Sequence, residues 1–408
     1  MLKAATAKID ITPADGSLMA CFPRRTDTGR QPRHARGAHD RLCARVLVLD
    51  DGRQPVVLCS CDCCGWRDTD IDRIRRQLAE RVPALGDEHC IIGATHTHSS
   101  PETLYMFGNT PRDPWVRQTI ERIAKAIADA YERRRPAGIT LGMTDAPLNF
   151  NRRSTDPRNR GQTVHEYAPG ATDEVTDPLL AVLSVRDADR RVLAVLANYT
   201  AHALTVGPHN DLYTADYPGV LCRQIESRIP EAAALFFNGA AGNIHPLQCM
   251  RRDFRVMEAF GTRLAEYALP LVESGTPLEV NRFTFATRTL SFVNRMDASI
   301  QTSVELSCLR IGDALLLTVP AELFVEYQLR LRDALAPARV IVFGYTNGWA
   351  GYIPTLQAYE IGGYGVTAAD DPDPAYSRTA LPQHAGDEIY AALLDMGKAC
   401  LGTDFRTG

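Results

Sequence analysis

Two pairs of apolar stretches along the chain predict β-hairpins. Residues 41–52 and 54–62 are rich in Val, Leu and Cys and flank an Asp-Asp-Gly turn, which is a strong hairpin signal. Residues 179–188 and 191–200 form the second pair and are joined by an Asp-Arg turn. Clear hairpins of this kind argue against a fold in which every strand is followed by a helix.

Helical periodicity marks the segments between and after these hairpins. Residues 68–82 begin with Asp68 and repeat apolar positions at helical spacing, and 114–134 predict a long amphipathic helix. We expect further helices near 217–229, 253–272, 321–335 and 386–400, and further strands near 89–94, 139–150, 233–243, 281–292, 303–311, 313–319 and 339–344. The first 35 residues are rich in Pro, Gly and Arg and predict a loop, as does the tail at 345–385. The pattern indicates one α/β domain over 1–408, with mixed β-sheets, flanking helices and several β-hairpins.

Composition narrows the class of protein. A chain of 408 residues that is 45% hydrophobic and 23% charged is typical of a globular protein with a large core. The net charge of −4 gives no reason to expect nucleic acid as a partner. No apolar run approaches the roughly 20 residues of a membrane span, and residues 1–16 lack the apolar core of a signal peptide. We therefore expect a cytoplasmic protein that acts on a small molecule, and a homo-oligomer is compatible with these features.

The chain has 11 cysteines, most of them inside apolar runs such as 56–66. Buried free Cys behaves as a small apolar residue, and disulfides are rare in the cytosol. A thiolate zinc cluster at Cys61, Cys63 and Cys64 is the alternative, although the segment lacks a second CxxC pair. Core packing is the favoured interpretation.

Two histidines, His96 and His98, follow the apolar strand expected at 89–94. Residues two apart on a strand point to the same face, so this pair could direct two imidazoles at one metal ion. Histidine is the usual nitrogen ligand of zinc. Taken alone, the pair is weak evidence for a metal site, and a satisfied surface or core pair is the favoured interpretation.

Other residues able to bind a metal also follow apolar strands. His202 comes just after the strand at 191–200, and Glu322 follows the strand at 313–319. Glu322 has a simpler alternative role, since a carboxylate in a first helical turn complements the helix dipole. The loop at 344–365 is dense in Tyr and Gly. Because α/β sheets build their sites at the carboxyl ends of strands, these segments indicate one common site.

The order of these motifs resembles the neutral (non-lysosomal) ceramidase family. The segment "GATHTHSSPE" at 93–102 looks like the HTHS-P segment of that family. The motifs that follow in the same order are "NFNRR" at 149–153, "AH" at 201–202, "NGAAGNIHP" at 238–246, "PAELF" at 320–324 and "GYIPTLQAYEIGGYG" at 351–365. The openings "KIDITPADG" and "GAHDRLCARVLVLDDG" are also similar. The resemblance covers the chain from about residue 6 to about residue 370.

The resemblance implies a zinc hydrolase that cleaves an amide with metal-activated water. By motif, the zinc ligands would be His96, His202, Glu322 and Tyr352, with one zinc ion expected and a second metal left open. His98 would transfer a proton beside the metal. Arg152 and Tyr359 would lie near the scissile carbonyl, with Tyr364 as a rival for the place of Tyr359.

The chain departs from the family in ways that affect the expected substrate. The Gly-rich turn reads G-D-V-S-P in the family but "GNIHP" here, so that His245 replaces the active-site serine and Asn243 the aspartate. His245 could contact the substrate or bind a metal. We expect no C-terminal immunoglobulin-like domain within 1–408. A small and polar amide or ester is therefore favoured over ceramide.

Three alternative functions stay open from the sequence. A lactonase or carbohydrate esterase would use the same metal site, because activated water attacks any such carbonyl. A non-catalytic binding protein would explain the change to His245. A TIM-barrel amidohydrolase also carries an HxH pair at a strand end, although usually at its first strand, and here strands at 41–62 precede it.

Overall fold

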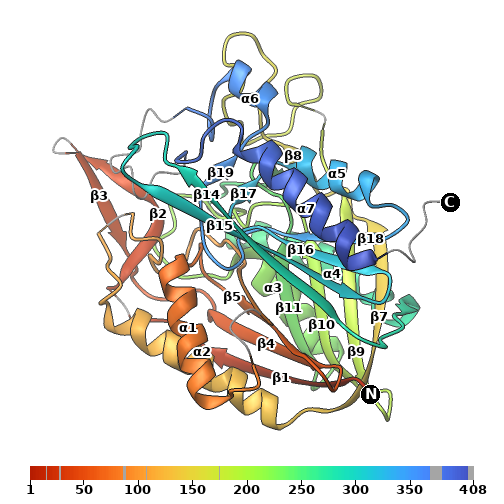
Figure 1. The fold of residues 1–408 in the computed structure, drawn as a ribbon. Coiled ribbons are helices and arrows are strands. Elements are labelled where there is room, and N and C mark those ends of the chain that lie inside the picture. The colour runs from red at the N-terminus through yellow and green to blue at the C-terminus, as the bar shows by residue number, and fades with distance from the viewer. Residues whose placement is uncertain are drawn as a thin grey trace.

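The computed structural model describes residues 1–14, 16–26, 29–85, 89–106, 108–173, 175–367 and 379–402. A nine-stranded mixed sheet has the order β11-β10-β9-β7-β1-β4-β5-β6, with β13 added at β7, and a second sheet has the order β14-β15-β16-β18 (Figure 1). The strands of the first sheet are β1 (Lys3–Asp10), β4 (Cys43–Asp50), β5 (Pro55–Cys61), β6 (Cys90–Ala94), β7 (Arg135–Asp145), β9 (Leu179–Asp187), β10 (Val192–Tyr199), β11 (Ala233–Asn238) and β13 (Thr276–Pro277). Those of the second are β14 (Thr284–Val293), β15 (Gln301–Ile311), β16 (Ala314–Thr318) and β18 (Arg339–Phe343).

The predicted hairpins and helices are confirmed, within a few residues at their ends. Strands β4 and β5 pair antiparallel, as do β9 and β10. The helices are α1 (Asp68–Arg81), α2 (Pro114–Glu132), α3 (Asp216–Arg228), α4 (Phe254–Ser274), α5 (Val325–Ala334), α6 (Leu356–Ile361) and α7 (Ala385–Leu401). Within the described ranges, no helix is both long and apolar enough to cross a membrane.

The prediction that the first 35 residues form a loop is wrong. Strand β1 runs antiparallel to β4 along its whole length, and β2 (Leu18–Thr26) pairs with β3 (Gly29–His34). The β1 sequence KAATAKID has short or charged side chains and little strand propensity of its own. The hydrogen-bond ladder to β4 decides its conformation.

The two sheets pack face to face between two layers of helices. Along β4, Val46 joins the core beneath α1 and α2 together with Ile123, whereas Leu47 joins the core between the sheets together with Leu316. On the outer face of the second sheet, Leu317 belongs to the core that includes α5 and α7. Both faces of the central strands are therefore buried, which explains why their sequences are almost continuously apolar.

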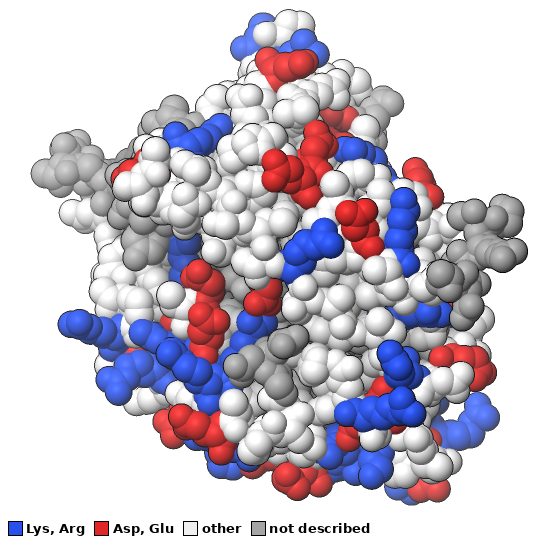
Figure 2. Space-filling view, viewed as in Figure 1, with Lys and Arg blue, Asp and Glu red and all other residues white. Residues whose placement is uncertain are grey.

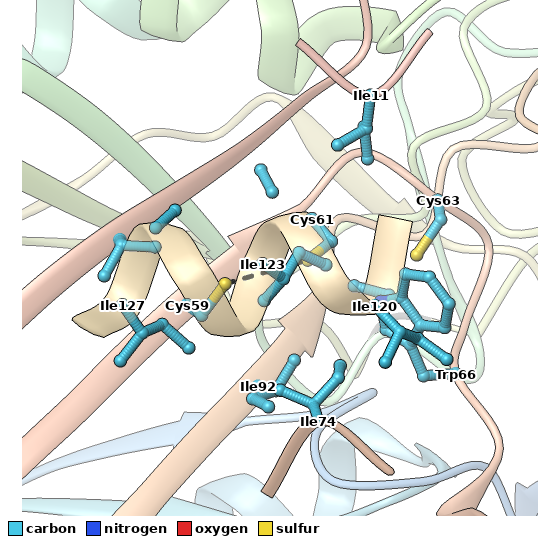
Figure 3. Close-up of a cluster of buried hydrophobic side chains, with 14 of the residues drawn as sticks. Ile11, Cys59, Cys61, Cys63, Trp66, Ile74, Ile92, Ile120, Ile123 and Ile127 are labelled. Atoms are coloured by element: carbon cyan, nitrogen blue, oxygen red, sulfur yellow. Dashed lines mark hydrogen bonds between the residues drawn. The ribbon is translucent and has the colours of Figure 1, made fainter. Parts of the chain in front are cut away.

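The cysteine-rich segment after residue 56 lies in the core beneath α2. Figure 3 shows Cys59, Cys61 and Cys63 among apolar side chains of this cluster, including Trp66 and Ile123. The thiol sulfur atoms of Cys59 and Cys61 are 3.8 Å apart. Among the described residues, Cys61 and Cys63 belong to no candidate metal-ligand group, whereas Cys64 lies in one with Cys21 and His98. The packing of Cys61 and Cys63 agrees with the apolar interpretation.

The surface carries charges of both signs. Figure 2 shows Lys and Arg interspersed with Asp and Glu on the face in view, as the small net charge of −4 leads one to expect. Many of these charges form ion pairs, such as Arg330 with Asp387 at 3.1 Å between α5 and α7. Exposed pairs of this kind contribute little to stability.

The carboxyl ends of parallel strands from both sheets meet at one edge. Strands β5 and β6 are parallel, as are β10 and β11 in the first sheet and β16 and β18 in the second. The backbone N–H of Ala94 donates to the carbonyl of Tyr345 at 3.0 Å, and that of Gly344 donates to Asn238 at 3.0 Å. These bonds join the sheets where the motif-bearing loops begin.

Glu322 lies outside the helix in which it was predicted. It forms the short strand β17 (Glu322–Leu323), which pairs in parallel with β19 (Tyr352–Ile353). Helix α5 begins later, at Val325. The helix-dipole role considered for Glu322 therefore does not apply, because the residue precedes the helix.

Candidate metal centre

The histidine pair leaves β6 on a backbone that is held by the end of β5. The N–H of Thr95 donates to the carbonyl of Cys61, and the N–H of His96 donates to that of Cys63, both at 2.9 Å. His96 has a φ of +67°, a left-handed conformation that is uncommon outside glycine. Strained backbone of this kind clusters at functional sites. Here it accompanies a His96 side chain that is turned into the interior and buried.

Three imidazoles and one carboxylate converge at this edge. The Nε2 atoms of His96 and His202 lie 3.4 and 3.2 Å from Oε2 of Glu322. The Nε2 atom of His98 lies 3.2 Å from that of His96, and a ligand atom from each of the three histidines lies within 4.8 Å of the others. His96, His202 and Glu322 are buried, whereas His98 is half-buried. The structure thus brings together four of the residues that the sequence singled out.

Backbone carbonyls orient two of these imidazoles. Nδ1 of His96 donates to the carbonyl oxygen of Cys64 at 2.6 Å, and Nδ1 of His202 donates to that of Ile244 at 3.1 Å. A carbonyl can only accept a hydrogen bond, so each Nδ1 carries a proton, and in the neutral ring each Nε2 then presents a lone pair. Metal-ligating histidines are oriented in this way in proteins.

The protonation states also suit a divalent cation. Burial acts to raise the pKa of Glu322, but His96 and His202 hold this pKa well below its ordinary value. Burial, together with nearby Arg152, lowers the pKa of His202 to about 3. Oε2 of Glu322 and Nε2 of His202 are buried without a hydrogen-bond partner among the described residues. A buried carboxylate and two imidazoles whose Nε2 atoms face it fit a zinc ion with an open position for water.

Arg152 is fixed beside this centre. It follows β8 (Asn149–Asn151) and is buried. Its guanidinium donates to the carbonyl of Gly242 at 2.6 Å and to the hydroxyl of Tyr352 at 3.1 Å. The Tyr352 and Tyr364 rings lie 5.6 and 5.0 Å from its carbon Cζ. A positive charge with a defined direction therefore faces the site.

The tyrosines differ from the expected arrangement. Tyr359 lies on α6 and packs against Arg295, whose guanidinium carbon is 5.5 Å from the ring centre. The described contacts place Tyr364, and not Tyr359, beside Arg152, because Gly362 and Gly363 turn the chain back after α6 with positive φ angles of 77° and 93°. Direct ligation of a metal by Tyr352 stays a prediction; its hydroxyl accepts a hydrogen bond from Arg152.

His245 lies next to the centre on a different support. It belongs to β12 (Ile244–Pro246), which pairs with β8 opposite Phe150. Its ring centre is 5.5 Å from that of His202 and 5.6 Å from that of His165. The side chain is fully buried. The residue that replaces the serine of the family motif therefore faces the candidate ligands.

Sequence reasoning missed three residues of this region. Tyr345 stacks on His96, with ring centres 4.1 Å apart, and it stands at the end of β18 as the other site residues stand at strand ends. The position of Tyr345 just after a strand could have marked it as a candidate site residue. His165 and Cys249 lie beside His245 but come from irregular segments, where neither spacing nor periodicity marks them.

Fold and site together define a class: a mixed α/β protein whose strand ends hold a buried centre of histidines and a carboxylate, suited to a metal ion. Residues 26–246, more than half of the chain, match the family described as neutral/alkaline non-lysosomal ceramidase, N-terminal. The chain belongs to this family.

Individual relatives agree with this assignment. The chain is 25% identical over 233 residues to neutral ceramidase of Pseudomonas aeruginosa, covering 52% of this chain and 32% of that protein. Neutral ceramidase of Drosophila melanogaster is 27% identical over 202 residues, covering 47% and 28%. The matched segment thus spans about a third of these relatives.

Solved structures show the same fold. The crystal structure of neutral ceramidase from Pseudomonas aeruginosa matches with a TM-score of 0.74 at 18% identity, covering 97% of this chain and 74% of that one. A structure described as ceramidase complexed with C2 gives 0.75 at 16% identity, with the same coverage. The expected fold class is confirmed.

Proposed function

We propose that the protein is a zinc-dependent hydrolase that cleaves the C–N bond of an N-acyl amide with water. The observation that carries this proposal is the convergence of His96, His202 and Glu322, with both imidazoles oriented by backbone carbonyls. Catalytic zinc sites use about three protein ligands of this kind and keep one position open. Membership in a family whose named relatives are ceramidases supports the same chemistry.

When bound, zinc supplies a Lewis acid and lowers the pKa of a water molecule to about 7. Arg152 is placed to stabilise the negative charge that develops on the carbonyl oxygen, since its guanidinium is buried and held by Gly242 and Tyr352. His98 is half-buried and is placed to donate a proton to the leaving nitrogen. In the overall reaction, the water oxygen would bond to the carbonyl carbon, the C–N bond would break, and the proton that the water loses would pass by way of His98 to the departing amine.

The proposed substrate is small and polar. The side chains that surround Arg152 are largely polar or charged and include Arg153, Thr163, Asn243 and Tyr364. Charged and hydrogen-bonding surroundings suit a compact polar acyl group or amine better than two lipid chains. The same site could open an ester or a lactone, so substrate class has to be decided by assay.

The first test measures metal and activity on the same samples. The protein as purified is compared with a His96→Ala/His202→Ala variant for zinc content and for hydrolysis of a panel of N-acyl amides, esters, lactones and ceramide. A His34→Ala/His384→Ala variant is the matched control, because both of these histidines are exposed. Circular dichroism checks that all variants fold.

We expect about one zinc ion at this site and activity on at least one polar amide, both lost in the His96/His202 variant alone. A zinc content that is undiminished in a folded His96/His202 variant would overturn the ligand assignment. Bound zinc with no hydrolysis of any member of the panel would favour the alternative of a non-catalytic binding protein.

A further inference from the structure

A second group of metal-binding side chains lies beside the first centre. Atoms able to bind a metal from His165, His245 and Cys249 all fall within 4.8 Å of one another. Backbone pairing holds the segments together, since Glu166 and Gln248 form an antiparallel bridge. The thiol of Cys249 also donates to the carbonyl of His165 at 3.0 Å. The three side chains are thus brought together by the fold and not by their positions in the sequence.

An independent feature of His245 points to a ligand. This imidazole is fully buried, and both Nδ1 and Nε2 are without a hydrogen-bond partner among the described residues. Buried polar atoms are nearly always paired, because leaving one unpaired is costly. His202 contrasts with it, as its Nδ1 is bonded to a carbonyl. Something other than the described side chains has to satisfy the ring of His245.

We propose that His165, His245 and Cys249 form a second metal site that binds a thiophilic divalent ion such as zinc. Two imidazoles and one thiolate suit zinc and are poor ligands for magnesium or calcium. On binding, the S–H bond of Cys249 breaks, its proton passes to solvent, and the sulfur binds the ion. His165 is exposed and gives the ion a path from solvent to the buried pair.

A neighbouring thiol group is a weaker candidate. Cys21, Cys64 and His98 also lie close together, but the sulfur atoms of Cys21 and Cys64 are 3.4 Å apart and hydrogen-bond each other. His98 already faces His96 in the first centre. This group therefore has internal partners, and it serves as a control.

Cobalt provides a readout that does not depend on activity. The chain is stripped with a chelator and titrated with Co²⁺, and the thiolate-to-cobalt charge-transfer absorption is recorded together with zinc content. The first centre has only nitrogen and oxygen ligands, so this absorption reports sulfur ligation. The variants are Cys249→Ala and His165→Ala. Cys222→Ala is the matched control, since Cys222 is also a buried free thiol, and Cys21→Ala/Cys64→Ala controls for the other thiol group.

We expect about two zinc ions per chain and a thiolate band, with one ion and the band lost in Cys249→Ala. In His165→Ala, which changes an exposed residue, the affinity should fall by at least about tenfold. Both controls should keep the band. No thiolate band in the wild-type chain, or a band lost only in Cys21→Ala/Cys64→Ala, would overturn the proposal. The first centre is read separately, as the zinc that remains in Cys249→Ala.

Discussion

Two candidate metal clusters lie side by side and are built in different ways. The first contains His96, His98, His202 and Glu322, and the second contains His165, His245 and Cys249. In the first, the imidazoles of His96 and His202 are each tied to a backbone carbonyl, and Glu322 supplies a negative charge. In the second, His245 has no such tie among the described residues, and the cluster contains a thiol in place of a carboxylate. The first is oriented before any ion binds, whereas packing alone holds His245 in the second.

This difference predicts which of the two clusters binds a metal ion more tightly. A ligand set whose outer nitrogens are already bonded loses little freedom on binding, so the first centre should bind metal more tightly. The second centre has to deprotonate Cys249, whose pKa burial raises to about 12. Metal must therefore displace a proton there at neutral pH.

The largest loss of activity should come from removing the negative charge of Glu322 in the first cluster. We expect Glu322→Gln to lower kcat/KM by about a thousandfold, since several kcal/mol of metal-derived stabilisation is lost. Zinc content, measured by mass spectrometry, should fall by one equivalent. Glu326→Gln is the matched control, because that carboxylate accepts from Asn243 at 3.1 Å and does not face the imidazoles. Equal losses in both variants would contradict the assignment of Glu322.

A smaller loss of activity should follow from replacing Arg152, the cation beside the first cluster. Arg152→Lys keeps the charge but replaces the planar guanidinium, whose Nη2 donates to both the Gly242 carbonyl and the Tyr352 hydroxyl, with an ammonium group on a stem of different length. We expect kcat to fall by about a hundredfold with KM little changed, as for loss of one oxyanion donor. Steady-state kinetics separate the two constants. A rise in KM alone would assign Arg152 to ground-state binding of the substrate.

The Phe variants of the two tyrosines near the first cluster should differ from each other by about tenfold in kcat. Tyr364→Phe should reduce kcat modestly, because the ring lies 5.0 Å from the guanidinium carbon of Arg152 and the loss of its hydroxyl changes the polar surroundings of that cation. Tyr359→Phe should leave kinetics unchanged, since this ring packs against Arg295 on α6. The reverse ranking would restore Tyr359 to the site and would require a different loop arrangement.

The smallest effect should be on stability. Removing a ligand that is present at about a hundred times its Kd lowers the free energy of unfolding by about 3 kcal/mol. In a chain of this size, such a loss lowers Tm by a few degrees. A chelator should therefore lower Tm in the wild type, and re-added zinc should restore it. In Glu322→Gln, the remaining shift measures the second cluster alone. Calorimetry that shows no remaining shift would mean that the second cluster binds too weakly to matter.

Local patterns were sufficient for most elements. The hairpin at 41–62 has a turn signal between apolar stretches, and α2 has helical periodicity with Asp113 accepting from two backbone N–H groups at its start. The β2–β3 pair is a local hairpin that escaped prediction because its Arg- and Pro-containing sequences lack alternating apolar positions. Strand β1 escaped prediction because its order comes from β4, which lies far along the chain. The short strand at Glu322 escaped for the same reason as β1, since its partner is Tyr352.

By itself, the sequence determined the class of fold, because hydrophobic periodicity is local. It also singled out His96, His98, His202 and Glu322, which follow apolar strands and lie in motifs similar to those of the family. The tertiary structure alone decided how these residues meet, which tyrosine stands beside Arg152, and that His165 and Cys249 approach His245. Contacts between distant segments depend on sheet register and loop paths, which no short window of sequence encodes.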